Sequence, residues 1–377
     1  MMRKINIFIC AFFLQLILFF PLNFLYDFQL KFTQFVFGNS TQFILETIFS
    51  KKYVRIDYSS DSYSMLILIL ILLFTSIIFS CLMKEKWTRY FLLVTEYICT
   101  MYIAVILIKY GIDKIFKTQF PEPESNLLLT RLGNLDKDIL FWSTIGTSKI
   151  YNTIIGSIEF FSGILLLFRS FRLSGLLLAI ICFAQVFIIN ISFDISVKFF
   201  SLILLGMSLF LVRKNGWKLI LIIISFKDKT FFDRPLFLPY KTFFKILILG
   251  IIFIKIGMPY LHNDLNTEAK KDSLGLAGAY HVTSLNCPYQ YIFFHKDHYL
   301  IFMEESSEKM ISFHYDISFD QQIIIEDDQH NVSKHSLIKN ENDDSIIFSF
   351  NNQIIKAKSV DHKGMNALQD RFHILVD

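Results

Sequence analysis

Seven long apolar stretches constrain this chain more than any other feature. Most of them approach the roughly 17–25 residues that an α-helix needs to cross a bilayer. Among its 377 residues, 53% are hydrophobic and the mean hydropathy is +0.47, values typical of a polytopic membrane protein. We therefore predict about seven transmembrane helices, at residues 5–20, 65–82, 90–109, 150–168, 173–191, 197–212 and 243–260.

Basic residues in the loops between these stretches set the predicted orientation. With the N-terminus inside, the cytoplasmic segments carry about 15 Lys/Arg against 3 Asp/Glu, and the opposite loops about 11 against 10. The positive-inside rule then predicts a multi-pass protein of the bacterial inner membrane, with a cytoplasmic N-terminus. An odd number of spans puts the C-terminus in the periplasm. The fragment 219–226, flanked by lysines, is expected to lie as an amphipathic helix at the inner face.

The composition changes at about residue 263. Residues 263–377 hold 18 Asp/Glu against 10 Lys/Arg, whereas residues 1–262 hold 15 against 27. Short runs rich in β-branched and aromatic residues alternate here with polar turn clusters, which predicts an all-β domain outside the cytoplasm, either an antiparallel meander or a small barrel. The runs are 279–285, 289–294, 298–303, 309–316, 321–327, 345–350, 353–358 and 371–376.

A glutamate stands near the middle of the apolar stretch 150–168. A carboxylate near the bilayer centre costs about 3 kcal/mol or more, so Glu159 needs hydrogen-bond donors. Helical periodicity places Ser148, Asn152 and Glu159 on one face. Two interpretations stay open: a glutamate that holds helices together, or the wall of a proton-relay or ligand site.

A second carboxylate, Glu96, also lies deep in its apolar stretch. If Glu96 and Glu159 approach each other, repulsion and desolvation would keep one of them protonated near neutral pH, which suits proton transfer. We therefore place Glu159, Asn152, Ser148 and Glu96 in a candidate intramembrane polar site.

Charged and polar side chains gather where two helices are expected to leave the membrane on the outer side. Asp194 and Lys198 have the spacing of an ion pair between adjacent helical turns, which usually stabilises a helix end by only a few tenths of a kcal/mol. The alternative is a polar vestibule above Glu159. Its candidate residues are Tyr110, Asp113, Lys114, Gln119, Asp194 and Lys198.

No catalytic motif stands out in the sequence. We find no phosphate-binding glycine loop, no nucleophile elbow and no Cys-x-x-Cys pair. His295 and His298 interrupt two strand-like runs, which is typical of a turn, so we expect no metal site there. The basic residues lie in loops between apolar stretches, which argues against a nucleic-acid partner and leaves the lipid bilayer as the expected one.

The helix around Glu159 resembles the signature of the DoxX-like membrane proteins. Gly156, Glu159 and Gly163, followed by Arg169, Arg172 and Gly175, are similar to that family's Gly-x-x-Glu-x-x-x-Gly helix with a basic turn and a glycine-containing helix after it. Tyr110 to Lys114 resembles the exit of the family's first core helix. Residues 119–123, 141–152 and 190–198 are similar to long Bacteroidetes-type members with extra helices and a C-terminal β domain.

The resemblance covers roughly residues 90–212 and implies a four-helix core. With it, we divide the chain into an N-terminal pair of spans (1–89), a DoxX-like core (90–212), a cytoplasmic segment with the last span (213–262) and a periplasmic β domain (263–377). The family includes subunits that look like parts of a thiosulfate:quinone oxidoreductase. This implies a membrane component of a redox process that holds a quinone or another small apolar ligand near Glu159.

A second hypothesis comes from another class of function. In it, the chain is a non-enzymatic scaffold whose helices anchor the β domain, and this domain binds a protein of the cell envelope. The two hypotheses differ in what Glu159 contacts: a ligand in the first, a neighbouring helix in the second.

Overall fold

The computed structural model divides the chain into two compact units. The helical unit comprises Met1–Phe116 and Thr153–Met258, and the insertion–barrel unit comprises Lys117–Asn152 and Pro259–Asp377. The structure describes residues 2–20, 26–50, 55–225, 243, 246–247, 250–251, 254–255, 258, 275–284, 287–295, 298–317, 322–326, 332–340, 344–350 and 353–369.

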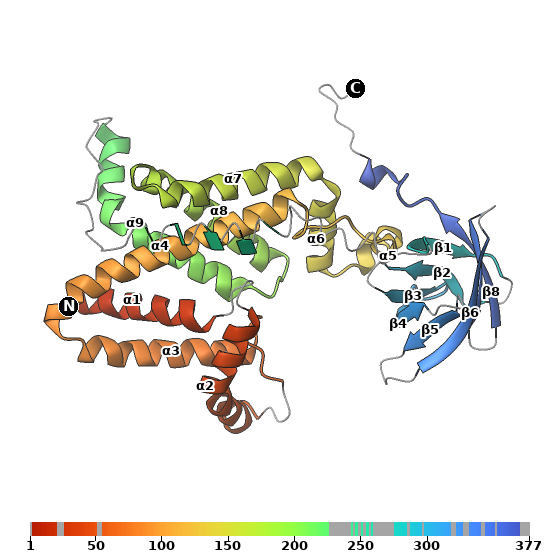
Figure 1. Ribbon diagram of the computed structural model, residues 1–377, viewed down its shortest axis with the longest axis horizontal. Coiled ribbons are helices and arrows are strands. Elements are labelled where there is room, and N and C mark those ends of the chain that lie inside the picture. Colours follow the sequence, from red (N-terminus) through yellow and green to blue (C-terminus); the bar gives the residue numbers. More distant parts are fainter. Residues whose placement is uncertain are drawn as a thin grey trace. The chain divides into compact units, whose positions relative to one another are not determined.

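The helical unit consists of long helices (Figure 1). Many apolar side chains on them are exposed, among them Phe74, Ile181 and Leu202. Within the described residues, four helices are long and apolar enough to cross a membrane: Tyr63–Leu82, Glu85–Ile115, Lys149–Leu167 and Arg169–Ser192. The helices of this unit are α1 (Met2–Phe19), α2 (Tyr26–Thr47), α3 (Tyr63–Leu82), α4 (Glu85–Ile115), α7 (Lys149–Leu167), α8 (Arg172–Ser192) and α9 (Lys198–Ser225), with α7 beginning in the other unit.

The predicted count of seven spans is not supported by these residues. Helix α1 forms as expected, but Arg3 and Lys4 occupy its first turn and leave an apolar stretch at the short end of what a bilayer needs. Helix α9 is one continuous helix, so residues 219–225 extend it and do not begin the separate amphipathic helix that we expected. The predicted span at 243–260 lies mostly outside the described residues.

Helix α2 forms where the polar composition of residues 27–64, between the first two predicted spans, predicts a loop; this prediction is wrong for Tyr26–Thr47. Its polar side chains bind the last carbonyl groups of α1, which have no partners within that helix. Gln29 Nε2 donates to the carbonyls of Ile17 and Leu18 at 3.1 and 3.2 Å, and Thr33 Oγ1 donates to Phe19 at 2.6 Å. These polar residues made the segment look like a loop, yet they stabilise a helix against α1.

Glycines let helices α4 and α7 pack with their backbones in contact. A Cβ atom on Gly156 would lie 2.6 Å from the carbonyl oxygen of Gly111, and one on Gly163 would lie 2.8 Å from that of Ala104. Side chains larger than hydrogen would therefore push the helices apart. The contact brings the middle of α7 against the C-terminal half of α4.

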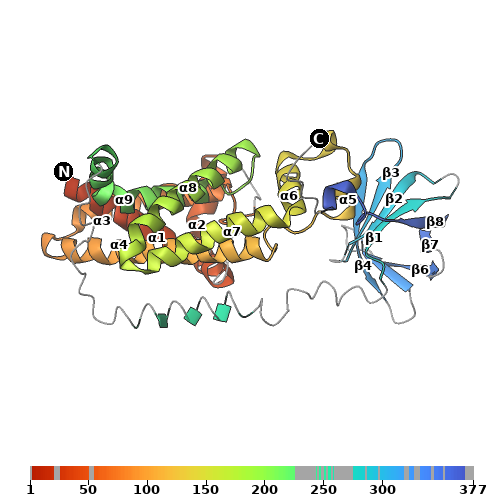
Figure 2. The ribbon, with the colours of Figure 1, turned by 90° about the horizontal axis from the view of Figure 1, so that it is seen from above.

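The insertion–barrel unit contains a closed eight-stranded barrel in meander order (Figure 2). Each strand pairs antiparallel with the next, and β1 pairs with β8 to close it. The interior is filled by aromatic and aliphatic side chains such as Phe294, Phe302 and Phe348, as is usual for eight strands. The strands are β1 (Gly278–Val282), β2 (Tyr289–Phe294), β3 (Tyr299–Glu304), β4 (Met310–Ile317), β5 (Gln322–Glu326), β6 (Val332–Asn340), β7 (Ser345–Phe350) and β8 (Gln353–Val360), with a 3-10 turn at Asn366–Leu368 after them.

The predicted all-β domain is thus confirmed, and seven of the eight predicted runs overlap strands. Strand β6 was missed because its sequence, VSKHSLIKN, is mostly polar and only Leu337 is fully buried. The last predicted run, 371–376, lies outside the described residues.

Residues 117–152, which we call the insertion, fold with the barrel although they come between α4 and α7. The insertion contains α5 (Ser125–Leu129), a 3-10 turn (Leu132–Asn134) and α6 (Lys137–Thr147). Leu129 packs on an apolar cluster of the barrel's outer surface formed by Ala279, Phe293, Ile301 and Met303. The second unit is therefore discontinuous in sequence, which the sequence did not predict.

Polar contacts accompany this packing. Arg131 Nε lies 2.7 Å from Glu308 Oε1, and Asn134 Nδ2 donates to Glu308 Oε2 at 2.8 Å. His295 Nε2 lies 3.0 Å from Asn126 Oδ1. Both barrel residues lie in turns, after β2 and between β3 and β4.

Candidate functional site

Glu159 forms a buried ion pair with Lys114. The Nζ atom of Lys114 lies 2.7 Å from Oε2 of Glu159, and the two side chains are only 7% and 5% exposed. The ring of Tyr110 lies near the same ammonium group, with its centroid 5.6 Å from Nζ. Since Lys114 is on α4 and Glu159 on α7, the pair joins two helices.

The glycine contact between these helices explains why the pair forms. Gly111 and Gly156 each lie one helical turn or less from a partner of the pair, and the Cβ atom of Lys114 would be 2.9 Å from a Cβ on Gly156. The close backbones place the lysine stem against α7, so its ammonium group reaches the carboxylate. An uncompensated charge here would cost several kcal/mol, whereas the paired charges compensate each other.

The other predicted members of the polar face have local partners. Asn152 Nδ2 donates to the carbonyls of Ile145 and Ser148 at 2.7 and 2.8 Å. Ser148 Oγ accepts a hydrogen bond from the backbone N–H of Tyr151 at 3.2 Å, as an N-terminal cap does. These two residues therefore shape the turn between α6 and α7. The Oδ1 atom of Asn152 is buried and has no hydrogen-bond partner in the structure.

Glu96 belongs to a different ion pair. Its Oε1 atom lies 2.9 Å from Nη2 of Arg213 on α9, and the guanidinium group also covers the ring of Phe210. Glu96 and Lys114 are 18 residues apart on α4, which corresponds to about 27 Å along the helix axis. Because Glu159 is bound to Lys114, the two glutamates are too far apart to share a proton directly, and the hypothesis that they approach each other is wrong.

The residues of the predicted vestibule belong to three parts of the chain. Asp113 and Lys114 are on the last turns of α4, where Lys109 forms an ion pair with Asp113. Asp194 and Lys198 are at the connection between α8 and α9. Gln119 follows in the insertion, where its Oε1 atom is buried without a hydrogen-bond partner.

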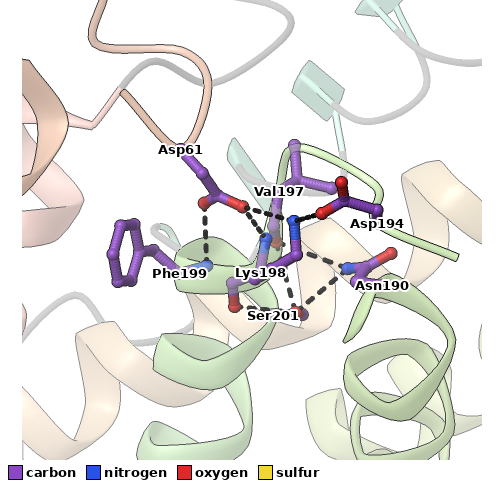
Figure 3. A network of polar contacts seen from close by, with 7 residues as sticks. All are labelled: Asp61, Asn190, Asp194, Val197, Lys198, Phe199 and Ser201. Atoms are coloured by element: carbon purple, nitrogen blue, oxygen red, sulfur yellow. Dashed lines mark hydrogen bonds and ion pairs between the residues drawn. The ribbon is translucent and has the colours of Figure 1, made fainter. Parts of the chain in front are cut away.

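The connection between α8 and α9 contains the polar network drawn in Figure 3. It also includes Asp61, which the sequence did not single out and which lies before α3. The carboxylate of Asp61 accepts from the backbone N–H groups of Lys198 at 2.7 Å and Phe199 at 3.0 Å. It therefore caps the N-terminus of a helix more than a hundred residues away in the sequence.

Three further contacts belong to the network. Lys198 Nζ lies 2.7 Å from Asp194 Oδ1 and 3.9 Å from Asp61 Oδ2, and Asp194 has a positive φ of 55°. Asn190 Nδ2 donates to Ser201 Oγ at 3.0 Å (Figure 3). The predicted ion pair between Asp194 and Lys198 is present, within a network that fixes the turn between two helices.

The basic residues of the family signature lie at the opposite end of α7. Arg172 Nε donates to the carbonyl of Leu166 at 3.4 Å, and Arg169 begins the 3-10 turn between α7 and α8. Ser162 Oγ donates to the carbonyl of Gly175 at 3.0 Å. The turn is thus fixed by side-chain contacts to backbone oxygens.

Comparison with known proteins finds no matching family model, no matching curated protein and no matching solved structure. The resemblance to DoxX-like proteins therefore stays a prediction, and the contacts above carry the functional argument alone.

Proposed function

We propose that this protein is a non-enzymatic membrane scaffold that holds the insertion–barrel unit on the periplasmic side of a bacterial inner membrane, where the barrel binds a protein of the cell envelope. The observation that carries the proposal is the ion pair of Glu159. A carboxylate already bound to Lys114 at 2.7 Å, with both side chains buried, acts as a contact between helices. A quinone or proton-relay site at Glu159 would first have to break this pair.

The contacts at the two ends of the helices support the proposed orientation. Arg3 lies 2.9 Å from Glu85, so α1 and α4 begin at one end, and Arg213 lies 2.9 Å from Glu96, so α9 runs towards that end from the Asp61 network. This end is rich in Lys and Arg, as cytoplasmic ends are. The insertion follows the opposite end of α4 and is accordingly periplasmic in the proposal.

The discontinuous unit supports an additional crossing. Because the barrel folds with the insertion, both lie on the same side of the membrane, and the chain between them crosses an even number of times. Helices α7, α8 and α9 account for three crossings if α9 runs from the Asp61 network to Arg213 within the bilayer. An even number requires one more crossing, for which the proposal takes the apolar stretch 243–260 of the sequence. With α1, α3 and α4, the proposed total is seven spans.

The four-helix core of the DoxX-like resemblance corresponds in this proposal to α4, α7, α8 and α9. Redox chemistry is not part of the proposal. The residues that carry the resemblance have structural contacts here: Lys114 and Glu159 form an ion pair, and Arg169 and Arg172 lie at a helix turn. The alternative is that Glu159 binds a quinone or another small ligand, and the quinone analysis described below distinguishes it from the scaffold function.

Photo-crosslinking in the native membrane tests the scaffold function. Tyr299 lies on the barrel and is 39% exposed, so a photoreactive phenylalanine can replace it with little disturbance. We expect a crosslink to one envelope protein, and we expect the same crosslink when Lys114→Met and Glu159→Leu are combined, since an apolar pair keeps the helices together.

Quinone analysis of the same purified protein supplies the opposing result. A quinone that co-purifies in stoichiometric amount with the wild type and is lost in Glu159→Gln, together with no crosslink from the barrel, would replace the scaffold function by the ligand hypothesis. The matched control is Glu96→Gln, which removes the carboxylate of the ion pair between Glu96 and Arg213.

A further inference from the structure

The strands of the barrel separate their charges. Strands β1 to β5 contain three acidic residues, Glu304, Asp316 and Glu326, and neither Lys nor Arg. Strands β6 to β8 contain four lysines and no acidic residue. This separation is notable in a domain that is acidic as a whole, with 18 Asp/Glu against 10 Lys/Arg in residues 263–377.

Exposed apolar side chains lie on the same three strands. Ile338, Ile347 and Ile354 are 61%, 36% and 68% exposed. Ile338 and Ile347 are directly opposite each other in the β6–β7 ladder, and Ile347 is opposite Lys356 in the β7–β8 ladder. Cross-strand partners share a face of the sheet, so these side chains form one continuous outer surface.

Three lysines border this surface. Lys334, Lys356 and Lys358 are exposed, and alternation along β6 and β8 puts them on the same outer side as Ile338 and Ile354. The fourth lysine, Lys339, is excluded because it donates to the carbonyl of Gly275 at 2.6 Å. We call the six outward residues Lys334, Ile338, Ile347, Ile354, Lys356 and Lys358 the Ile–Lys face.

The opposite side of the barrel is covered by another part of the chain. Its apolar outer cluster, which includes Phe293, Ile301 and Met303, is covered by the insertion through Leu129. Within the described part of the chain, the Ile–Lys face has no such cover, since its isoleucines are exposed. The barrel thus has one apolar outer surface that the chain itself occupies and a second one that is open and basic.

We infer that the Ile–Lys face binds the anionic surface of a lipid bilayer. Isoleucines that project from a rigid sheet can enter the headgroup region, while lysines place their charges on lipid phosphates and their stems on apolar surface. The acidic remainder of the domain would be repelled by such a surface, so binding would select this face. The inference rests on membrane anchoring of the chain, which keeps a bilayer at high local concentration, and not on the barrel's protein partner.

Lysine footprinting of the full-length protein in nanodiscs tests the inference. Acetylation rates of Lys334, Lys356 and Lys358 would be measured by mass spectrometry in discs of phosphatidylcholine alone and in discs that also contain phosphatidylglycerol. We expect the three rates to fall by roughly fivefold or more in the anionic discs and to recover at high salt, because salt screens the attraction. Lys309, in the turn between β3 and β4, is the internal control and should react equally in both discs.

A variant with Ile338→Ser, Ile347→Ser and Ile354→Ser separates the apolar contribution. These side chains are exposed, so the barrel should still fold, and the protection of the three lysines should largely disappear. Equal acetylation in both kinds of disc, or equal slowing of Lys309, would overturn the inference. So would protection that appears only after a native membrane extract is added, since that result identifies an acidic protein as the occupant. None of these outcomes depends on the crosslink from Tyr299, so the scaffold function and this inference can fail separately.

Discussion

The helical unit and the barrel place their polar groups in opposite positions. In the helical unit, Lys114 and Glu159 lie inside, while residues such as Phe74 and Ile181 are 65% and 63% exposed on the outside. In the barrel, Phe302 and Phe348 are fully buried, and most charged side chains are outside. The helical unit thus has the distribution of side chains that suits lipid, and the barrel has the one that suits water. In lipid, helices are specified by polar contacts and close packing, whereas in water the barrel is driven together by apolar burial.

The largest effect that separates the two units is expected in the barrel core. Phe302 stacks on Phe350 with ring centroids 4.6 Å apart, and Phe302→Ala should destabilise the barrel by about 3–5 kcal/mol, because it removes a buried ring and leaves a cavity. Thermal unfolding, monitored by proteolytic cleavage of the barrel, would measure this loss of stability. Ile347→Ala removes an outward side chain and is the matched control. A comparable loss in both variants would contradict the assignment of the inner and outer faces.

In the helical unit, stability should depend on a buried polar contact, the ion pair between Lys114 and Glu159. Lys114→Met leaves Glu159 buried without its partner, and we expect a loss of about 3–5 kcal/mol. Adding Glu159→Leu should restore most of that stability, because an apolar pair of similar volume suits the interior of a helix bundle. Unfolding in detergent, measured for the wild type and for the single and double variants, gives the coupling energy.

A matched control for this pair is Lys109→Met. Lys109 pairs with Asp113 on the same helix, but its side chain is 20% exposed, so its loss should cost much less than that of Lys114. If the double variant of Lys114 and Glu159 is no more stable than Lys114→Met alone, the glutamate interacts with something other than the lysine, and the ligand hypothesis regains support.

A smaller effect is expected at the Asp61 network. Asp61→Ala removes the acceptor for two backbone N–H groups at the start of α9, which should cost about 1–2 kcal/mol. Asp194→Asn is the control, since the Asp194 side chain is 85% exposed, its ion pair with Lys198 should contribute little, and asparagine tolerates the positive φ at this position. Equal losses in the two variants would show that the exposed ion pair, and not the cap, holds the turn.

In both units, the sequence predicted the elements whose apolar patterns are local and missed elements that contacts with other parts of the chain stabilise. Helices α3, α4, α7 and α8 and seven strands were predictable because their apolar periodicities are strong and local. Helix α2 was missed because polar residues such as Gln29 and Thr33 are typical of a solvated loop. In the structure they donate hydrogen bonds to carbonyl groups of α1. Strand β6 was missed because its place is set by pairing with β5 and β7, not by its own composition.

The sequence singled out both residues of the buried ion pair but placed them in different candidate sites. Glu159 and Glu96 stood out because charges in apolar stretches are costly, whereas Lys114 was placed in the outer vestibule. Which cation each carboxylate contacts depends on helix packing, and the glycine contacts that bring Lys114 to Glu159 are visible only in three dimensions. Arg213 and Asp61 gave no signal, since an arginine or aspartate at a helix end is ordinary in sequence.

The smallest expected effect concerns a polar turn of the helical unit that lies outside its spans. Burial alone would raise the pKa of Asp57, but hydrogen bonds from Ser59 and Ser60 and the nearby charge of Arg55 lower it below its ordinary value. A carboxyl whose pKa is lower in the folded state contributes stability above its unfolded pKa and loses that contribution as the pH falls through the folded value. Asp57→Asn should therefore reduce stability near neutral pH slightly and flatten the decline below about pH 4. Unfolding measured across this range, with Asp27→Asn at the start of α2 as the control, decides whether the turn contributes to acid sensitivity. An unchanged acid profile in Asp57→Asn would mean that other carboxylates of the protein determine it.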